Sequence, residues 1–247
     1  YEVAAVVTVP DKPAGRGKKI QSSHVKETAL KYGLPVMQPV SLKSPEFIEE
    51  LSSYNADLFV VVAFRMLPEV VWSMPPMGTF NLHASLLPQY RGAAPINHAI
   101  INGEKETGLT TFLLDKEIDT GEIIMQEKVI IEEKETAGTL HDKLMILGNK
   151  VVVETIKMIE EGKVYSQSQE SIIERENLQL KPAPKIFKED CKIDWTKDAK
   201  SVYDFIRGLS PYPAAHTRFV SEDGETLDLK IYDVTLEERL SDDYKLN

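Results

Sequence analysis

Cysteine is almost absent from this chain of 247 residues, and long apolar runs are absent altogether. Cys191 is the only cysteine, so an intrachain disulfide is excluded, and this composition suits a reducing compartment such as the cytoplasm. The longest apolar stretch, Leu58 to Phe64, has the length of a strand and falls well short of the roughly 20 residues that a membrane helix needs. No membrane segment is therefore expected.

Positive charge is also scarce. The sequence has 29 Lys and Arg residues against 39 Asp and Glu, a net charge of −10. This balance argues against broad, unspecific binding of nucleic acid. The charge is uneven, however, because residues 10–31 hold six basic and two acidic residues, a local net charge of +4. An acidic body with one basic loop can still meet a polyanion at that loop.

Strand-like and helical segments alternate along the first two thirds of the chain. Short apolar runs predict strands at 3–9, 36–40, 58–63, 79–83, 108–114, 123–125 and 128–131, and amphipathic patterns predict helices at 24–32, 44–54 and from Thr139 to about Gly162. Ser44 is the expected N-cap of the second of these helices, and Thr139 that of the third. The six consecutive apolar residues at 58–63 indicate a strand that is buried on both faces. The alternation predicts an α/β fold with a Rossmann-like, mostly parallel sheet and helices on both of its faces.

The pattern changes after this region. Residues 1–165 are expected to form the main catalytic domain, residues 166–185 a linker, and residues 186–247 a small β-containing, barrel-like domain that is short enough to be incomplete. A helix is predicted at 198–208 and two strands at 215–220 and 226–232. The sequence begins inside a strand-like run, without a signal peptide or a Met, so an upstream first strand is expected to be missing.

Polar side chains with catalytic potential stand at two predicted strand ends. Asn81 and His83 are two residues apart in one strand and share a face, and Asp119 follows a later strand. In parallel α/β sheets, ligands bind outside the carboxyl ends of the strands. These three groups suit acyl transfer to an amine, because Asn81 and protonated His83 can stabilise an oxyanion. Asp119 would favour the cationic histidine and help to accept the proton of the amine.

Each motif taken singly has an ordinary explanation. Asn-x-His at a strand end is more often structural, and Asp119-Thr-Gly121 is a common turn sequence. The pair Gly15 and Gly17 lacks the third glycine of a dinucleotide fingerprint, and no cluster has the spacing of metal ligands, so no metal site is expected. Cys191 has no histidine near it in sequence and is a poor candidate nucleophile.

Two longer motifs resemble those of the folate-dependent formyltransferase family. They are Asn81-Leu-His-Ala-Ser-Leu-Leu-Pro-Gln-Tyr-Arg-Gly-Ala-Ala-Pro-Ile96 and Leu114-Asp-Lys-Glu-Ile-Asp-Thr-Gly121. The resemblance implies that Asn81, His83 and Asp119 are catalytic and that 10-formyltetrahydrofolate is the cosubstrate, with no tightly bound cofactor. It also implies a folate site formed by Ser85, Leu86, Leu87, Pro88, Arg65, Met66, Leu67 and Asp115.

The resemblance extends to the basic loop at 10–19. This loop is similar to the one with which the tRNA-acting members of the family enter the acceptor stem of initiator tRNA, and it implies that Arg16, Lys18 and Lys19 contact tRNA. Guanidinium and ammonium groups on a Gly-containing loop can reach phosphates and base edges. The alternative is a solvated basic loop without a partner.

The leading expectation is N-formylation of initiator methionyl-tRNA by a monomeric enzyme. Formylation of an amino-sugar nucleotide or a purine precursor would use the same three residues. Hydrolysis of 10-formyltetrahydrofolate to formate is a third possibility, and a tRNA- or folate-binding protein without turnover is a fourth.

Overall fold

The computed structural model describes residues 1–14, 19–63 and 65–237, and the contacts within it divide the chain into two units. The first unit covers Tyr1–Asn81 and the second Leu82–Asn247. The boundary falls inside strand β6 (Thr79–His83), which therefore belongs to both units. Each unit has its own apolar core.

The strands that open the first unit are short. Strand β1 (Val6–Val7) pairs in parallel with β4 (Val36–Met37), and β2 (Lys12–Ala14) pairs antiparallel with β3 (Lys19–Gln21). The strands predicted at 3–9 and 36–40 are thus shorter than expected, because only two residues of each pair with the other strand. The segment that contains the basic loop was expected to have no strands, but β2 and β3 pair within it.

The described part of the first unit contains three helices, and the sequence predicted two of them, at 24–32 and 44–54. These helices are α1 (His24–Lys31), α2 (Pro45–Ser53) and α3 (Glu69–Trp72). The Ser44 hydroxyl accepts the Phe47 N–H at the start of α2, which confirms the predicted cap. Gly33 follows α1 with a φ of +66°, the left-handed conformation that glycine tolerates best.

Strand β5 (Phe59–Val62) differs from its expected burial on both faces. Phe59 packs against the core of the first unit, whereas Val60 and Val62 are 41% and 54% exposed. The expectation of a doubly buried strand is therefore wrong. An apolar run reports the preference of its side chains, but only the neighbouring elements decide how many faces are covered.

The second unit is built on a long antiparallel pair. Strand β7 (Glu106–Leu113) pairs with β8 (Ile123–Ile130), a single strand where two short ones were predicted. Hydrogen-bonded neighbours run in the order β5-β6-β7-β8. With the parallel pair β1–β4, the sheets are mixed, and the α/β class predicted from the sequence is confirmed.

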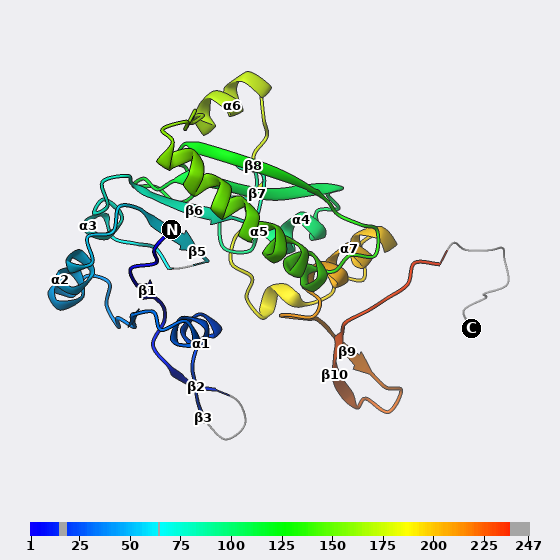
Figure 1. Ribbon diagram of the computed structural model, residues 1–247. Coiled ribbons are helices and arrows are strands. Elements are labelled where there is room, and N and C mark those ends of the chain that lie inside the picture. Colours follow the sequence, from blue (N-terminus) through cyan, green and yellow to red (C-terminus); the bar gives the residue numbers. More distant parts are fainter. Residues whose placement is uncertain (15–18, 64, 238–247) are drawn as a thin grey trace. The chain divides into compact units, whose positions relative to one another are not determined.

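Helix α5 (Ala137–Glu160) packs against β7 and β8 (Figure 1). Thr139 was expected to cap this helix, but the cap is Thr136. The Thr136 hydroxyl accepts the Thr139 N–H, and the Thr139 hydroxyl accepts the Thr136 N–H in return. Thr139 therefore occupies the third helical position of a capping box. Both threonines stabilise the start of the helix, but the N-cap is Thr136 rather than Thr139.

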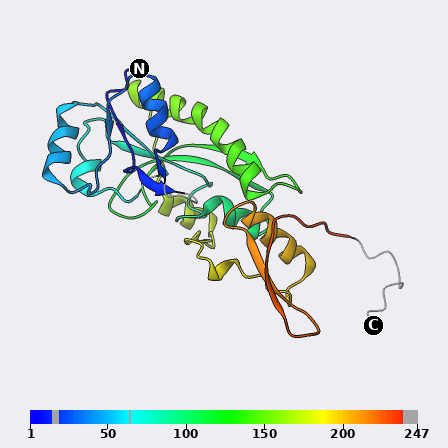
Figure 2. The ribbon, with the colours of Figure 1, turned by 90° about the horizontal axis from the view of Figure 1, so that it is seen from below.

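The rest of the second unit is mostly helical and ends in a hairpin. Its elements are α4 (Pro95–Ile101), α6 (Gln169–Glu176), a 3-10 turn at Glu189–Cys191, α7 (Ala199–Leu209), β9 (Ala215–Val220) and β10 (Thr226–Ile231). Helix α7 packs against α4, and the hairpin β9–β10 follows it (Figure 2). The sequence predicted α7 and both strands of the hairpin, whereas α6 lies in the segment that was expected to be a linker. None of the helices in the described ranges combines the length and apolarity needed to cross a membrane.

Candidate active site

His83 is buried at the end of β6, on the same face of the strand as Asn81. Its Nε2 lies 2.9 Å from the backbone oxygen of Tyr90. Because a carbonyl oxygen can only accept a hydrogen bond, this contact assigns a proton to Nε2. The other ring nitrogen, Nδ1, is then the one available for acid–base chemistry. The centroids of the His83 and Phe112 rings lie 6.5 Å apart in an edge-to-face arrangement, which gives the histidine an apolar neighbour.

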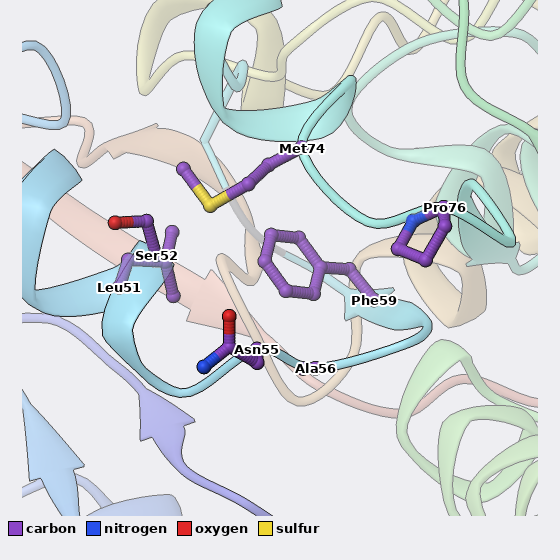
Figure 3. Close-up of a pocket in the computed structure, with 7 residues that line it drawn as sticks. All are labelled: Leu51, Ser52, Asn55, Ala56, Phe59, Met74 and Pro76. Atoms are coloured by element: carbon purple, nitrogen blue, oxygen red, sulfur yellow. The ribbon is translucent and has the colours of Figure 1, made fainter.

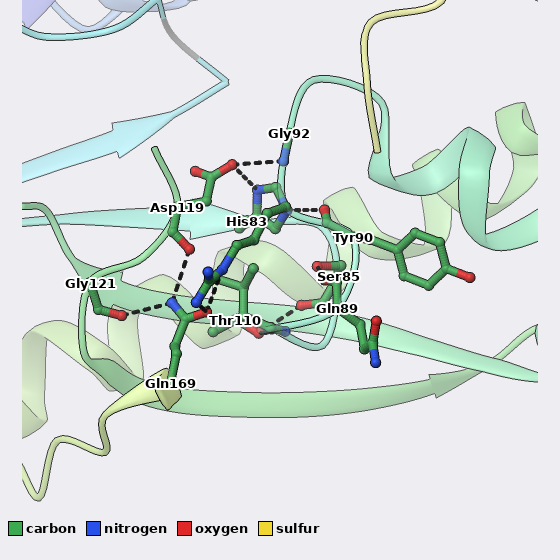
Figure 4. A network of polar contacts seen from close by, with 11 residues as sticks. His83, Ser85, Gln89, Tyr90, Gly92, Thr110, Asp119, Gly121 and Gln169 are labelled. Atoms are coloured by element: carbon green, nitrogen blue, oxygen red, sulfur yellow. Dashed lines mark hydrogen bonds and ion pairs between the residues drawn. The ribbon is translucent and has the colours of Figure 1, made fainter. Parts of the chain in front are cut away.

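Asp119 lies beside this ring, although it comes from a different loop (Figure 4). Its Oδ2 is 3.8 Å from His83 Nδ1, a distance that permits charge attraction but is too long for a hydrogen bond. The Gly92 N–H donates to the same oxygen at 3.0 Å. The structure therefore brings together His83 and Asp119, which the sequence had placed at two strand ends.

Asn81 has an unusual side-chain environment. Its Oδ1 is buried and has no hydrogen-bond partner among the described residues. Buried polar atoms nearly always have a partner, so this acceptor, in the same strand as the candidate catalytic histidine, is free to bind a donor on another molecule. A carboxamide here can offer an N–H donor and a carbonyl acceptor to a bound molecule.

The loop after β6 carries four of the expected folate residues. Ser85, Leu87 and Pro88 are buried, and Leu86 is partly buried. The Ser85 hydroxyl donates to the backbone oxygen of Gln89 at 2.7 Å, and Leu87 packs in an apolar cluster with Phe112. A ligand would therefore meet this loop mainly through its backbone rather than through the Ser85 and Leu87 side chains.

The other expected folate residues lie in two places. Asp115 is exposed and lines a shallow hollow of about 410 Å³ together with Lys116, Glu117, Thr120 and Glu170. Arg65, Met66 and Leu67 belong to the first unit. The Arg65 guanidinium donates to the backbone oxygens of Pro39 and Val40, Met66 is exposed, and Leu67 packs against the core of that unit.

The expected tRNA-binding residues belong to the segment of the sequence that runs from β2 into β3. Arg16 and Lys18 lie outside the described residues, and of Lys19 only the backbone, in β3, is described. Next to the hairpin, Lys26 Nζ lies 2.6 Å from Asp11 Oδ2. Hydrogen bonds from Lys26 and Gln38 hold the pKa of Asp11 below its usual value. One positive charge of this segment is therefore already paired within the protein.

A second hollow, of about 340 Å³, lies in the first unit (Figure 3). It is lined by Leu51, Ser52, Asn55, Ala56, Phe59, Met74 and Pro76. None of these side chains is titratable, so this hollow lacks the acid–base groups that acyl transfer needs. The candidate active site is therefore placed at His83 and Asp119 rather than at this hollow.

Cys191 is unsuited to nucleophilic chemistry, as the sequence predicted. It is buried, and its thiol donates to the backbone oxygen of Phe187 at 3.2 Å. Burial raises the pKa of this thiol, with a further contribution from the nearby Asp190. The neutral form is therefore favoured over the reactive thiolate.

Sequence reasoning missed Gln169, which is fully buried at the start of α6 (Figure 4). Its amide nitrogen donates to the backbone oxygens of Asp119 and Gly121, and its oxygen accepts from the Arg91 guanidinium. Two of its partners are backbone atoms, which have no signature in a sequence. A glutamine directly after the cap residue Ser168 was the only local hint.

Comparisons with known proteins connect this geometry to a family. Residues 1–156 match the family model described as formyl transferase, and residues 185–244 match the model of the formyl transferase C-terminal domain. A methionyl-tRNA formyltransferase of Bacteroides fragilis is 59% identical over 233 residues, covering 94% of this chain and 71% of the relative. Another, of Flavobacterium psychrophilum, is 53% identical over 246 residues, covering 100% of this chain and 76% of the relative.

Solved structures give the same fold at greater distance. A 4-N formyltransferase from Francisella tularensis has a TM-score of 0.64 at 21% identity and covers 86% of this chain and 84% of its own. A sugar N-formyltransferase from a Shewanella species has a TM-score of 0.61 at 19% identity and covers 85% of this chain and 81% of its own. At these identities the likeness concerns the fold alone.

Proposed function

Because the chain belongs to the formyl transferase family, we propose that it transfers the formyl group of 10-formyltetrahydrofolate to the amino group of initiator methionyl-tRNA. The family uses a folate-derived formyl donor. Relatives that are 53–59% identical carry the name methionyl-tRNA formyltransferase, whereas the structures named for sugar substrates are about 20% identical. The amino-sugar, purine and hydrolase alternatives are therefore not favoured.

The observation that carries the chemistry is the pairing of His83 with Asp119 next to a strand that also bears Asn81. Formyl transfer begins when the amine attacks the formyl carbon and the carbonyl electrons move to oxygen. Asn81 Nδ2 donates to this oxyanion, and His83 protonated at Nδ1 adds positive charge beside it. The uncompensated Asn81 Oδ1 supports this role, because a bound substrate N–H would give it a partner.

Proton movement completes the reaction. The attacking nitrogen loses one proton, which Asp119 accepts through Oδ1, while Oδ2 keeps the Gly92 N–H. Collapse of the tetrahedral intermediate breaks the bond between the formyl carbon and N10 of the folate. His83 Nδ1 then protonates N10, and the proton held by Asp119 restores the histidine. The products are the formylated amine and tetrahydrofolate, without a covalent enzyme intermediate.

Recognition of tRNA is assigned to Arg16, Lys18 and Lys19, on the basis of their charge and of the resemblance of their loop. Replacing all three by Ala is expected to raise the KM for tRNA and to weaken its salt dependence, with folate affinity nearly unchanged. A control with Lys150, Lys157 and Lys163 changed to Ala removes the same charge from exposed positions elsewhere. An equal effect of both triple variants would contradict a specific tRNA loop.

The direct test incubates the purified chain with 10-formyltetrahydrofolate and methionyl-tRNA and measures formylmethionyl-tRNA. Formation of this product is the expected result. Preferred formylation of an amino-sugar nucleotide would overturn the acceptor, and formate release at the same rate without any amine would indicate a hydrolase. A monomer in light scattering is also expected, and the cytoplasmic location stays a prediction from the single cysteine.

A further inference from the structure

Gln169 is a polar side chain with no exposed surface, and both of its N–H groups and its oxygen are hydrogen-bonded. Its Nε2 donates to the backbone oxygens of Asp119 at 3.0 Å and Gly121 at 2.8 Å. Its Oε1 accepts from Arg91 Nε at 3.0 Å and Nη2 at 2.8 Å. A buried amide with four bonds of good length holds its partners firmly, because breaking any one would leave a buried group unsatisfied.

One end of this arrangement holds the Asp119 loop. Asp119 has a φ of +56°, a left-handed conformation that residues other than glycine adopt only when their surroundings stabilise it. Gln169 binds the carbonyl of this same residue and that of Gly121. A Cβ at Gly121 would lie 1.7 Å from the Leu113 backbone oxygen, so the loop end also packs tightly onto β7. Gln169 thus stabilises the backbone from which the carboxylate projects.

The other end holds the segment that contacts both members of the pair (Figure 4). Arg91 is flanked by Tyr90, whose carbonyl accepts from His83, and by Gly92, whose N–H donates to Asp119. The guanidinium donates twice to a single oxygen of Gln169, which restricts its orientation. A side chain that binds Arg91 and the Asp119 backbone therefore links the two loops that carry these contacts.

We propose that Gln169 is a positioning residue that sets the spacing between His83 and Asp119 by joining the 90–92 segment to the 119–121 segment. This inference rests on the proposed function, because formyl transfer is the reaction that needs the pair. Gln169 does not contact the reacting groups itself. Its effect on turnover passes through Asp119, and this dependence is what an experiment can detect.

The experiment measures single-turnover formylation of methionyl-tRNA, with enzyme in excess, for Gln169→Met in two backgrounds. In the otherwise unchanged enzyme, this substitution is expected to slow the reaction by about ten- to a hundredfold, because small misplacements of reacting groups carry such costs. In the Asp119→Asn background it should slow the reaction by less than about threefold, because the group that it positions is already lost. Equal factors in both backgrounds would overturn the proposal.

Two further variants keep the result interpretable. Gln167→Met makes the same change at an exposed side chain two residues earlier and is expected to leave the rate unchanged. Gln169→Glu keeps the side-chain length and the acceptor for Arg91 but removes both donors to the Asp119 loop. It should remain folded and still show the rate loss, and full activity of this variant would overturn the proposal. An unchanged enzyme that makes no formylmethionyl-tRNA would instead refute the proposed function.

Discussion

The two loops that flank the candidate active site are held in different ways. In the loop 84–92, Ser85, Leu87 and Tyr90 are buried, and Thr110 on β7 binds the backbone directly. The Thr110 hydroxyl donates to the backbone oxygen of Ser85 at 2.6 Å and accepts the Leu87 N–H at 3.1 Å. Gln126 adds a bond from its side chain to the Leu87 oxygen. This loop is fixed along much of its length by the sheet beneath it.

The loop 115–121 is held mainly at its end. Residues 115–118 are exposed, and Asp115 Oδ1 accepts from the Glu117 N–H and the Thr120 hydroxyl within the loop itself. Asp119 and Gly121 bind a buried side chain from another segment, that of Gln169. Firm support thus coincides with the residues proposed to act, whereas the neighbouring tip of the loop is exposed. A loop can therefore be open to a ligand and still present one well-placed carboxylate.

The largest expected effect concerns the centre that both loops surround. His83→Ala should lower kcat/KM by about 10²- to 10⁴-fold, because it removes an acid–base group and a positive charge beside the oxyanion. His141→Ala is the control, since His141 is exposed on α5. The measurement is steady-state formylation of methionyl-tRNA. Full turnover of the His83 variant would contradict the proposed catalytic role of this histidine.

Support of the 84–92 loop by Thr110 is tested by a pair of identical substitutions on β7. Thr110→Val should lower the free energy of unfolding by about 1–3 kcal/mol, because it leaves buried backbone groups without their partner. Thr107→Val should be nearly neutral or stabilising, since the Thr107 hydroxyl is buried and has no partner among the described residues. Urea unfolding measures both. Similar losses in the two variants would show that Thr110 supports the fold only by its size.

Tyr90 in the same loop is anchored by a group that titrates. Its hydroxyl donates to Glu104 Oε1 at 2.5 Å, and Lys181 Nζ lies 2.5 Å from the same oxygen. Burial, together with Glu104, raises the pKa of Tyr90, so its hydroxyl stays a donor. Burial opposes the charge on Glu104, but the bonds from Lys181 and Tyr90 outweigh it and hold the pKa of Glu104 below its usual value.

This lowered pKa fixes the sign of a pH effect. A carboxyl with a lowered pKa in the folded state contributes stability above its unfolded pKa, and this contribution is lost as the pH falls through the folded value. Lys181→Met should therefore move the midpoint of acid unfolding to higher pH, with a loss of up to about 1 kcal/mol near neutrality because Lys181 is half exposed. Lys128→Met, which breaks the exposed pair with Glu106, serves as control. An unchanged acid midpoint would argue against this anchor.

The smallest effect is expected at the tip of the 115–121 loop. Asp115→Ala removes two local hydrogen bonds from an exposed position, and it should change the free energy of unfolding by less than about 0.5 kcal/mol. If Asp115 contacts folate as proposed, the KM for 10-formyltetrahydrofolate should rise at the same time. Urea unfolding and steady-state kinetics separate the two roles. A stability loss as large as that of Thr110→Val would remove the contrast between the loops.

The sequence by itself determined the features that depend on residues close together in the chain. The cap at Ser44, the helix that follows Asp198 and the hairpin of β9 and β10 all depend on contacts within a few residues or on alternation along a strand. For the same reason, the sequence placed Asn81 and His83 on one face of β6. The motifs that contain them were also enough to indicate the formyl transferase family, which the family models confirm.

Only the tertiary structure decided how these residues work together. Asp119 lies 36 positions after His83, and their approach depends on the path of two loops rather than on any local preference. The tautomer of His83 is set by a backbone carbonyl, that of Tyr90, and the Asp119 loop is held by Gln169, from a segment that was expected to be a linker. Backbone atoms are the same at every position, so a sequence cannot reveal which of them a buried side chain will bind.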